Sequence, residues 1–334
     1  MYNFNEHIRK ELLNEYGGSE RKRTVILDDG KKYLLKFPDP IRESGRNLSY
    51  INNALSEYIA CKIIREIGVP VQDVILGQYT DERGITKIAC ACQDVRSPGE
   101  SMYEIEKLQL GSLDPEEKDG ATFAGVEKII SKLADENTRS KLLDHFYDMF
   151  VVDTFLGNPD RHNGNWAVLS SNAGDIRPCP IFDCGSSLSP LIDDDSIRAI
   201  NVQREAMNVV SAIRNEDLSR LKYADFYNQR HLPRRVLQAM LRVLPAINLN
   251  KIHILIDNTE GLSDTRKKFY RDLLDCRYER ILLPALARNL NPVVATNANP
   301  VVDVYQFYKD ELAQLSDIDY QNYAAIPLAL AMGM

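Results

Sequence analysis

The 334-residue sequence lacks the features that mark several large classes of protein. Its longest apolar tail, residues 324–334, is far too short to cross a bilayer, so we expect no membrane span. The formal net charge of -7 gives no overall basic field, and we expect no direct binding of nucleic acid. The N-terminus carries charges where a signal peptide needs an apolar core. We expect a cytoplasmic protein, although leaderless export would leave no mark in the sequence.

Cysteine chemistry is equally sparse. The six cysteines form no C-x-x-C pair, and each lies in an apolar segment or beside the polar motif described below. This scatter is typical of reduced, partly buried thiols and argues against a disulfide framework or a zinc site. The rest of the composition, 44% hydrophobic and 27% charged, is that of an ordinary globular protein. The length suffices for two lobes that share a cleft.

The first part of the chain predicts a small α+β lobe with local connections. Residues 1–15 have the pattern of a short amphipathic helix, and its apolar side consists of Ile8, Leu12 and Leu13. Two β-rich segments on either side of Asp28-Asp29-Gly30 predict a hairpin. A helix should follow, with an N-cap at Ser49 and a stop signal at Gly68. The last predicted strands of this lobe cover residues 71–79 and 85–92.

The remainder of the chain is mostly helical in pattern. The polar connector of residues 93–99 is a natural boundary, which divides the chain into domains of residues 1–95 and 96–334. The predicted helices of the second domain cover residues 122–155, 232–244, 247–257, 264–290 and a stretch near 304–315. The expected fold class is therefore α+β, with a small β-rich lobe that contains one helix and a larger, mostly α lobe.

Candidate chemistry concentrates in two short polar segments. Residues 156–169 read L-G-N-P-D-R-H-N-G-N-W-A-V-L, and residues 180–187 read P-I-F-D-C-G-S-S. Asp160 and Asn165 have the spacing of the kinase catalytic loop H-R-D-x-x-x-x-N, and Asp183 stands where the aspartate of D-F-G would stand. The runs W-A-V-L and C-P-I-F should pair as a hairpin and bring Asp183 beside Asn165.

These residue types suit phosphoryl transfer, which needs positioning and charge neutralisation more than covalent chemistry. Mg²⁺ takes oxygen ligands and keeps several waters, so one carboxylate and one amide oxygen are sufficient protein ligands. Either segment alone would usually form a solvated turn on the protein surface without a catalytic role. Their order along the chain, after a lobe that carries a strand lysine, is much more specific.

The segments N-P-D-R-H-N-G-N and F-D-C-G-S-S resemble the HipA family of bacterial serine/threonine kinases, in particular its short members without the extra N-terminal domain. The resemblance covers most of residues 15–290 and implies a two-lobed protein-kinase-like fold that uses ATP and Mg²⁺. It implies that Asp160 is the catalytic base and that Asn165 and Asp183 are metal ligands. The order D-R-H-x-x-N is also similar to phosphatidylinositol 3/4-kinases. His162 would then either approach the transferred phosphate or brace the loop.

Lys36 lies in Y-L-L-K-F, a β-run with alternating burial, and a lysine there is expected to point towards the phosphates. Most strand lysines instead face water. A carboxylate partner favours the cleft, because Glu57 lies between apolar neighbours on the next helix and can pair with Lys36. Glu66 competes for this pairing but lies close to the helix end. The candidate catalytic residues are therefore Asp160, Lys36 and His162, with Arg161 as a structural ion-pair partner.

Further nucleotide contacts follow from the resemblance. The segment Y-G-G-S-E-R-K is by composition a flexible turn, and the resemblance makes it the loop that covers the phosphates. Its phosphate-binding residues would be Gly17, Gly18 and Ser19, and Ser19 is the nearest candidate for the serine that the family autophosphorylates. The connector residues Gln93 and Val95 would bind adenine through backbone groups.

The segment after Asp183 carries the acidic run Asp193-Asp194-Asp195. We expect this run to be solvated, although it could attract a basic substrate. Three serines of the same segment are candidate regulatory sites with little weight, because loop serines are common: Ser186, Ser187 and Ser189.

Three functional hypotheses result. The leading one is a HipA-like serine/threonine protein kinase that acts on a protein substrate, either as the toxin of a toxin–antitoxin pair with an antitoxin partner or as a secreted effector. The second changes the acceptor to a lipid or small molecule, but the acidic segment after Asp183 lacks the basic loop that a phosphoinositide needs. The third is a pseudokinase, which would have lost a key residue. None of Lys36, Asp160, Asn165 and Asp183 is lost.

Overall fold

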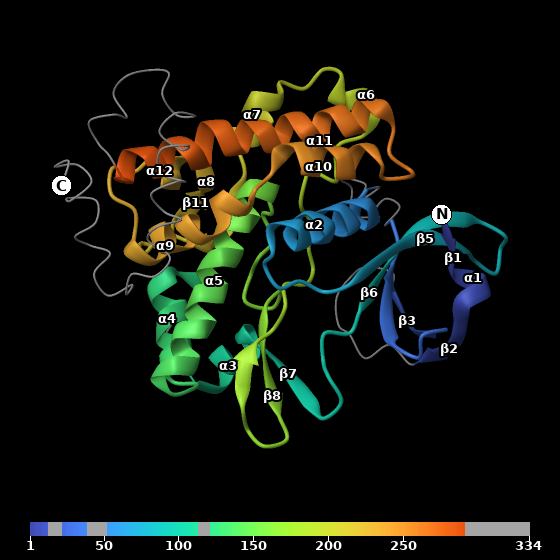
Figure 1. Ribbon diagram of the computed structural model, residues 1–334, viewed down its shortest axis with the longest axis horizontal. Coiled ribbons are helices and arrows are strands. Elements are labelled where there is room, and N and C mark those ends of the chain that lie inside the picture. Colours follow the sequence, from blue (N-terminus) through green and yellow to red (C-terminus); the bar gives the residue numbers. More distant parts are fainter. Residues whose placement is uncertain (13–21, 39–51, 113–120, 291–334) are drawn as a thin grey trace.

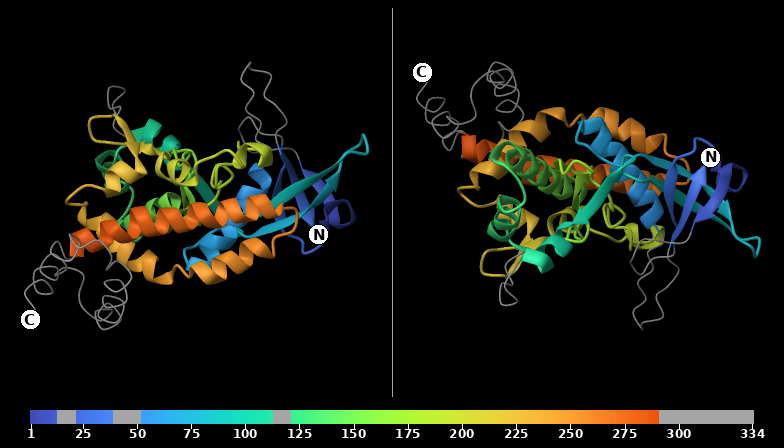
Figure 2. Two further views of the ribbon diagram at one scale, coloured as in Figure 1. Left: turned by 90° about the horizontal axis from the view of Figure 1, so that it is seen from above. Right: turned by 90° about the horizontal axis from the view of Figure 1, so that it is seen from below.

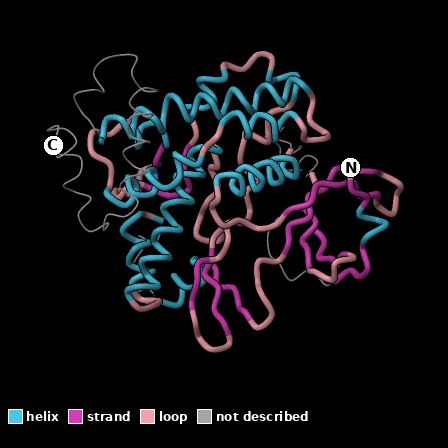
Figure 3. The backbone as a smooth tube through the Cα atoms, viewed as in Figure 1, coloured by secondary structure: helices cyan, strands magenta, loops and turns pink. Residues whose placement is uncertain are grey.

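The computed structural model describes residues 1–12, 22–38, 52–112 and 121–290 (Figure 1). It has the expected α+β class, with a curled β-sheet in a small lobe and helices in a larger lobe (Figure 1, Figure 3). Helix α2 (Asn53–Ile67) lies between the two and packs on the sheet and on helix α10 (Leu249–Asp257).

Six strands form the sheet of the small lobe, in the order β1-β5-β6-β4-β3-β2. Neighbouring strands are antiparallel except β1 and β5, which run parallel. The hairpin predicted around Asp28-Asp29-Gly30 joins β3 to β4, and the later pair of predicted strands corresponds to β5 and β6. The strands are β1 (Tyr2–Asn3), β2 (Ile8–Leu12), β3 (Lys22–Leu27), β4 (Lys32–Lys36), β5 (Val74–Thr80) and β6 (Thr86–Gln93).

The first strand can join this sheet only because its neighbour carries a glycine. Phe4, Val25 and Leu35 have no exposed surface and belong to one apolar core. A Cβ atom at Gly77 of β5 would stand 2.6 Å from Phe4 Cε2 and 2.5 Å from Tyr2 O. Any larger residue at position 77 would therefore push β1 away from β5.

The prediction of a helix over residues 1–15 is wrong for the part that the structure describes. Only Phe4–His7 (α1) is helical, whereas Ile8–Leu12 (β2) pairs with β3. A helix of this length is marginal in water. The edge of β3 instead offers a ladder of backbone hydrogen bonds to residues 8–12. A local hydrophobic pattern cannot reveal this partner, because β3 lies outside the segment that shows the pattern.

Helix α2 is buried over most of its surface. It ends as predicted at Gly68, where a φ of 90° lets the glycine N–H reach the carbonyl oxygens of Ile64 and Arg65. It begins at Asn53, and the predicted N-cap Ser49 lies outside the described residues. Because α2 contacts both lobes, its side chains are available to link them.

The larger lobe contains the helices predicted up to residue 290, while the stretch near 304–315 lies outside the described residues. Its last helices continue one another through a π-helical turn and run along the lobe (Figure 2). The helices are α3 (Ile105–Ser112), α4 (Phe123–Ser131), α5 (Glu136–Leu156), α6 (Asp194–Ile197), α7 (Val202–Met207), α8 (Tyr223–Tyr227), α9 (Arg234–Val243), α11 (Asp264–Arg277) and α12 (Leu283–Leu290), with the π-turn at Tyr278–Leu282.

In the described part of this lobe, five short strands accompany the helices. Strand β7 was not predicted, because E-S-M-Y-E has no apolar run; it forms by pairing with β8, which corresponds to the predicted W-A-V-L strand. Strands β10 and β11 form a separate pair. The strands are β7 (Glu100–Glu104), β8 (Ala167–Ser171), β9 (Ile176–Pro178), β10 (Val210–Arg214) and β11 (Arg220–Lys222).

The hairpin after the central motif uses a different second strand from the one predicted. β8 pairs with β9, whereas the prediction placed the partner strand at residues 179–182. Pro180 has no N–H and cannot continue the ladder. Ile181 instead makes a single parallel bridge with Val71, next to the small lobe. The segment that leads to Asp183 is thus attached to the chain between α2 and β5.

Two expectations from composition can be compared with the structure. All six cysteines are free thiols, and five of them are buried. Within the described ranges, no single helix combines the length and apolar character needed to cross a membrane. Residues Arg234–Ala246 and Leu249–Asp257 meet that test only as a pair, which is bent by 63°.

Helix α5 ends at Gly157, directly before the central motif. Gly157 has a φ of 65° and faces Arg277 of α11, which has no exposed surface. Arg277 Nη1 donates to Leu156 O at 2.9 Å. A Cβ atom at position 157 would lie 2.2 Å from Arg277 Cζ. The helix end therefore needs glycine both for its conformation and for the close approach of the guanidinium.

Gly157→Ala should destabilise the protein more than the matched variant Gly174→Ala. Gly174 also has a left-handed φ of +88°, but no atom lies within 4 Å of its added Cβ. Gly174→Ala should cost about 1–2 kcal/mol of backbone strain. Gly157→Ala should cost about 1–3 kcal/mol more, because Arg277 must move. Urea unfolding of the two variants measures the difference, and equal losses would show that the close approach to Arg277 carries no energy.

Candidate active site

A cavity of about 280 Å³ lies between the sheet and the larger lobe. Its walls come from β4, β6, the connector between the lobes, the central motif and the segment before Asp183. Several lining residues belong to the predicted site: Lys36, Gln93, Val95, Asn165 and Asp183. The other lining residues were not predicted from the sequence, and they include Leu34, Gln72, Cys92, Met102 and Phe182.

Lys36 lines this cavity and connects the two lobes. Its Nζ donates to Glu57 Oε2 at 2.8 Å and to Asp183 Oδ1 at 2.6 Å. Lys36 is 6% exposed and Glu57 is 0% exposed, so both charges have left water and need partners. The predicted contact of Lys36 with Glu57 is confirmed. The competing carboxylate, Glu66, pairs instead with Lys251 at 3.0 Å.

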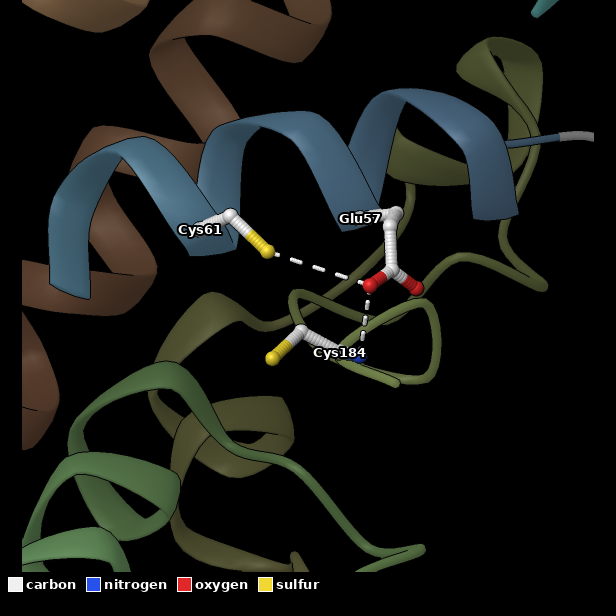
Figure 4. Close-up of side chains that lie close together, drawn as sticks. All are labelled: Glu57, Cys61 and Cys184. Atoms are coloured by element: carbon white, nitrogen blue, oxygen red, sulfur yellow. Dashed lines mark hydrogen bonds between the residues drawn. The ribbon is translucent and has the colours of Figure 1, made fainter. Parts of the chain in front are cut away.

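The other oxygen of Glu57 accepts from several donors. Gln72 Nε2 lies 2.6 Å from Oε1. The Cys184 N–H donates to the same oxygen at 3.0 Å, and Cys61 Sγ lies 3.8 Å from it (Figure 4). The ligand atoms of Glu57, Cys61 and Cys184 lie within 4.8 Å of one another, which is close enough to surround a metal ion. The donors already occupy Oε1, and burial raises the pKa of the Cys61 thiol. We therefore interpret the group as a buried hydrogen-bond cluster.

Asp183 occupies an unusual backbone conformation. Its φ is 57°, in the left-handed region where aspartate and asparagine are better tolerated than most residues. Desolvation by the cavity walls acts to raise the pKa of its carboxyl group, but the Lys36 ammonium outweighs this effect and holds the pKa below its usual value. The carboxylate is therefore ionised at neutral pH and can hold a cation.

Arg161 fixes the central motif from within. This side chain is 2% exposed, and its Nε donates to Asp153 Oδ2 at 2.9 Å, which confirms the predicted ion-pair role. Its Nη1 donates to Asn165 O at 2.6 Å and to Phe182 O at 2.5 Å. Its Nη2 lies 3.5 Å from Cys184 Sγ. One guanidinium thus joins the end of α5, the motif and the segment that carries Asp183.

Asn158 supports the same loop from the other end. Its Nδ2 donates to Asp153 Oδ1 at 2.9 Å, and its Oδ1 accepts the Asp160 N–H at 3.1 Å. Its carbonyl oxygen accepts the Tyr223 hydroxyl at 2.9 Å. The loop that presents Asp160 is therefore held by buried polar contacts on both sides.

The Asp160 side chain is 54% exposed. Ser186 Oγ lies 3.4 Å from its Oδ2, and His162 Nε2 lies 3.9 Å from its Oδ1. Desolvation is the main influence on the pKa of Asp160 and raises it; His162 opposes the rise, and Asp183 adds to it. His162 Nδ1 accepts the Gly164 N–H at 3.1 Å, a contact that suits the loop-bracing interpretation.

Asn165 and Asp183 lie in one cavity, as predicted. Asn165 Nδ2 donates to Asp160 O at 2.8 Å, which leaves the amide oxygen as the atom for a cation. An amide oxygen and a carboxylate are ligands that suit a hard divalent ion. The residues present therefore fit magnesium, although their role as ligands stays a prediction.

The other predicted nucleotide contacts are only partly described. Gly17, Gly18 and Ser19 lie outside the described residues. The Gln93 N–H donates to Asp73 O at 2.8 Å within the small lobe, so adenine would have to use another atom of Gln93. Val95 lines the cavity, and its role in adenine binding stays a prediction.

Sequence reasoning missed two residues that organise the site. Asp153, the partner of Arg161, is a charge inside the apolar run M-F-V-V-D-T-F, and that isolation was the available signal. Gln72, the partner of Glu57, lies in an ordinary V-P-V-Q-D segment, and nothing in that segment distinguishes it.

The expectation of a solvated acidic run is wrong for one of its members. Asp194 Oδ1 accepts Arg266 Nε at 2.7 Å, and Arg266 Nη2 donates to Ile192 O at 2.5 Å. Asp193, the N-cap of α6, and Asp195, which is 94% exposed, both face solvent. The run fixes the segment after Asp183 to α11 through a contact between residues that are distant in sequence.

Known proteins resemble this chain in sequence and in fold. Residues 15–248 match the HipA-like C-terminal domain. The chain is 33% identical over 282 residues to the serine/threonine-protein kinase CtkA of Helicobacter pylori, and the match covers 82% of this chain and 84% of that protein. The crystal structure of the H. pylori proinflammatory kinase CtkA superposes with a TM-score of 0.75 at 31% identity, covering 86% of this chain and 96% of that one.

A more distant structural match is HipA of Shewanella oneidensis in complex with HipB and operator DNA. Its TM-score is 0.46 at 15% identity, and the match covers 84% of this chain and 68% of that one. The domain match and the level of identity with CtkA define the family without this structure. The chain belongs to the serine/threonine protein kinases that carry the HipA-like C-terminal domain.

Proposed function

We propose that this kinase uses ATP and Mg²⁺ to phosphorylate serine or threonine in proteins, in a cleft between an N-lobe of residues 1–95 and a C-lobe of residues 96–334. The main support is the position of Lys36 Nζ, which contacts both Glu57 and Asp183 in a cavity that Asn165 also lines. Phosphoryl transfer depends on a lysine at the phosphates and on carboxylate and amide oxygens at the metal.

Asn165 and Asp183 would hold the metal. The Lys36 ammonium, 2.6 Å from Asp183, supports this assignment because it marks a position that attracts a cation. When bound, Mg²⁺ and ATP supply the phosphoryl group and neutralise its charge. Lys36 would then orient the phosphates, and Glu57 would orient Lys36.

Asp160 would accept the proton of the acceptor hydroxyl. Its exposed position leaves room for a protein substrate, and a raised pKa makes its carboxylate a better proton acceptor. His162 is assigned to the same catalytic loop, where its contact with Gly164 favours a bracing role over contact with the transferred phosphate. The backbone of Gln93 and Val95 would bind adenine.

The phosphate-covering loop and autophosphorylation rest on the family resemblance. Gly17, Gly18 and Ser19 would cover the triphosphate, and Ser19 would be the autophosphorylated residue. A protein substrate follows from the kinase activity of the family. The description of CtkA as a proinflammatory kinase favours the effector alternative over the toxin with an antitoxin partner.

Asp160→Asn should lower phosphorylation of a generic protein substrate by about 10²- to 10⁴-fold, because the amide cannot accept the hydroxyl proton. Asp175→Asn, in the exposed turn between β8 and β9, is the matched control and should keep normal activity. Circular dichroism should show an unchanged fold for both. Full activity in Asp160→Asn would contradict its role as the base.

Radiolabelled ATP with Mg²⁺ should label the protein itself and an added protein, but not an added lipid. Asp183→Asn keeps the shape of the side chain while it removes the charge, and it should abolish the label. Chelation of Mg²⁺ should have the same effect on the wild type. Label on lipid alone would overturn the protein-kinase assignment.

Phosphopeptide mapping after incubation with ATP should find phosphate on Ser19. This prediction concerns the position of the phosphate and not the kinase activity. The mapping is therefore carried out on wild-type protein that has been shown to be active. Ser19→Ala should lack that phosphopeptide. A labelled protein without phosphate on Ser19 would refute the site.

A further inference from the structure

Gln72 is a buried amide between the two lobes. It is 6% exposed and lines the same cavity as Lys36 and Asp183. Its Nε2 lies 2.6 Å from Glu57 Oε1, and the nitrogen must face the carboxylate because two oxygens at that distance would repel. Its backbone N–H donates to Ile181 O at 2.9 Å, so the segment that leads to Asp183 is fixed to the same residue.

The hydrogen-bond donors of Glu57 differ in whether they would have to move when a nucleotide enters the cavity. Lys36 serves two carboxylates, Glu57 and Asp183, and it is the group that would move when phosphates enter the cavity. The donors on Oε1 are Gln72 Nε2, the Cys184 N–H and the Cys61 thiol. The second contact of Gln72 Nε2 is with Cys61 Sγ, at 3.6 Å, and not with another carboxylate. A carboxylate with no exposed surface keeps its position only while its acceptor sites are satisfied.

We propose that Gln72 is a positioning residue of this kinase: its amide holds the Glu57 carboxylate in the orientation that directs Lys36 to the phosphates. This inference rests on the proposed function, since it needs Lys36 to act on the nucleotide. It assigns a role in the site to a residue that lies outside the catalytic loop around Asp160, the segment that carries Asp183, and strand β4 with Lys36.

The first test removes the donor and keeps the volume. Gln72→Met should lower kcat/KM for ATP roughly 10- to 100-fold, the value of a hydrogen bond to a buried charge. Gln78→Met is the matched control, because Gln78 is exposed on β5, and it should behave as the wild type. Urea unfolding of both variants separates a loss of positioning from a loss of folded protein.

The second test restores the donor by pH. In Gln72→Glu the introduced carboxyl lies against Glu57, and like charges raise the pKa of such a pair. Below that pKa the proton lets the new group donate to Glu57; above it the two carboxylates repel. Activity relative to wild type should therefore be highest at acidic pH and fall as pH rises, whereas Gln72→Met should show no such trend.

Other ionisable groups of the described residues lie around Glu57 and share its environment. Asp160 and the ionisable groups near Glu57 are present in every variant. Dividing each activity by the wild-type value at the same pH therefore removes their contribution to the pH dependence. Burial raises the pKa of Cys61, so this thiol stays protonated through the assay. The neighbouring ionisable groups are Lys36 from β4, Cys61 from α2, Cys92 from β6, Arg161, and Asp183 with Cys184 from the metal loop.

The outcomes separate the two proposals. A low activity of Gln72→Met with acid recovery of Gln72→Glu supports the positioning role. Active wild type with both Gln72 variants equal to it overturns that role and leaves the proposed function intact, as does a loss that merely follows the fraction unfolded. If the wild-type protein transfers no more phosphate from ATP than Asp160→Asn does, the proposed function is overturned, and the positioning role is overturned with it.

Discussion

One carboxylate without exposed surface, Glu57, determines how the two lobes meet. A buried charge must be matched by donors, and those of Glu57 come from β4, from the segment before β5 and from the loop after Asp183. Satisfying this single group therefore places Lys36 and Asp183 at their observed distance. Packing of α2 against the sheet buries apolar surface and stabilises the contact between the lobes. The hydrogen bonds of Glu57 determine the relative position of the two lobes.

A second buried pair, Arg161 with Asp153, acts on the other side of the same loop. Arg161 also binds the carbonyl oxygen of Phe182 and contacts the Cys184 thiol, while the Cys184 N–H binds Glu57. The residues around Asp183 are thus held from both lobes at once. Removing one member of either pair would leave a charge without its partner, which costs more than the pair itself contributes.

The sequence predicted those parts of the fold and the site that depend on local patterns. Hydrophobic spacing located α2, α5 and the long C-terminal helices. Of the predicted site residues, Lys36, Asn165 and Asp183 line one cavity, whereas the roles of these residues and of Asp160 stay predictions. The errors arose where a distant partner decides the outcome. Residues 8–12 became a strand because β3 was available, and E-S-M-Y-E because β8 was. Gln72 and the pairing of Asp194 with Arg266 depend on contacts that no local pattern encodes.

The backbone at Asp183 also limits which residues evolution can place there. Its φ of 57° disfavours most side chains, and aspartate and asparagine are the oxygen-bearing types that tolerate it best. Glutamate could supply the same carboxylate, but it has neither that tolerance nor the right length. The choice of residue at position 183 is therefore constrained twice, by backbone conformation and by chemistry.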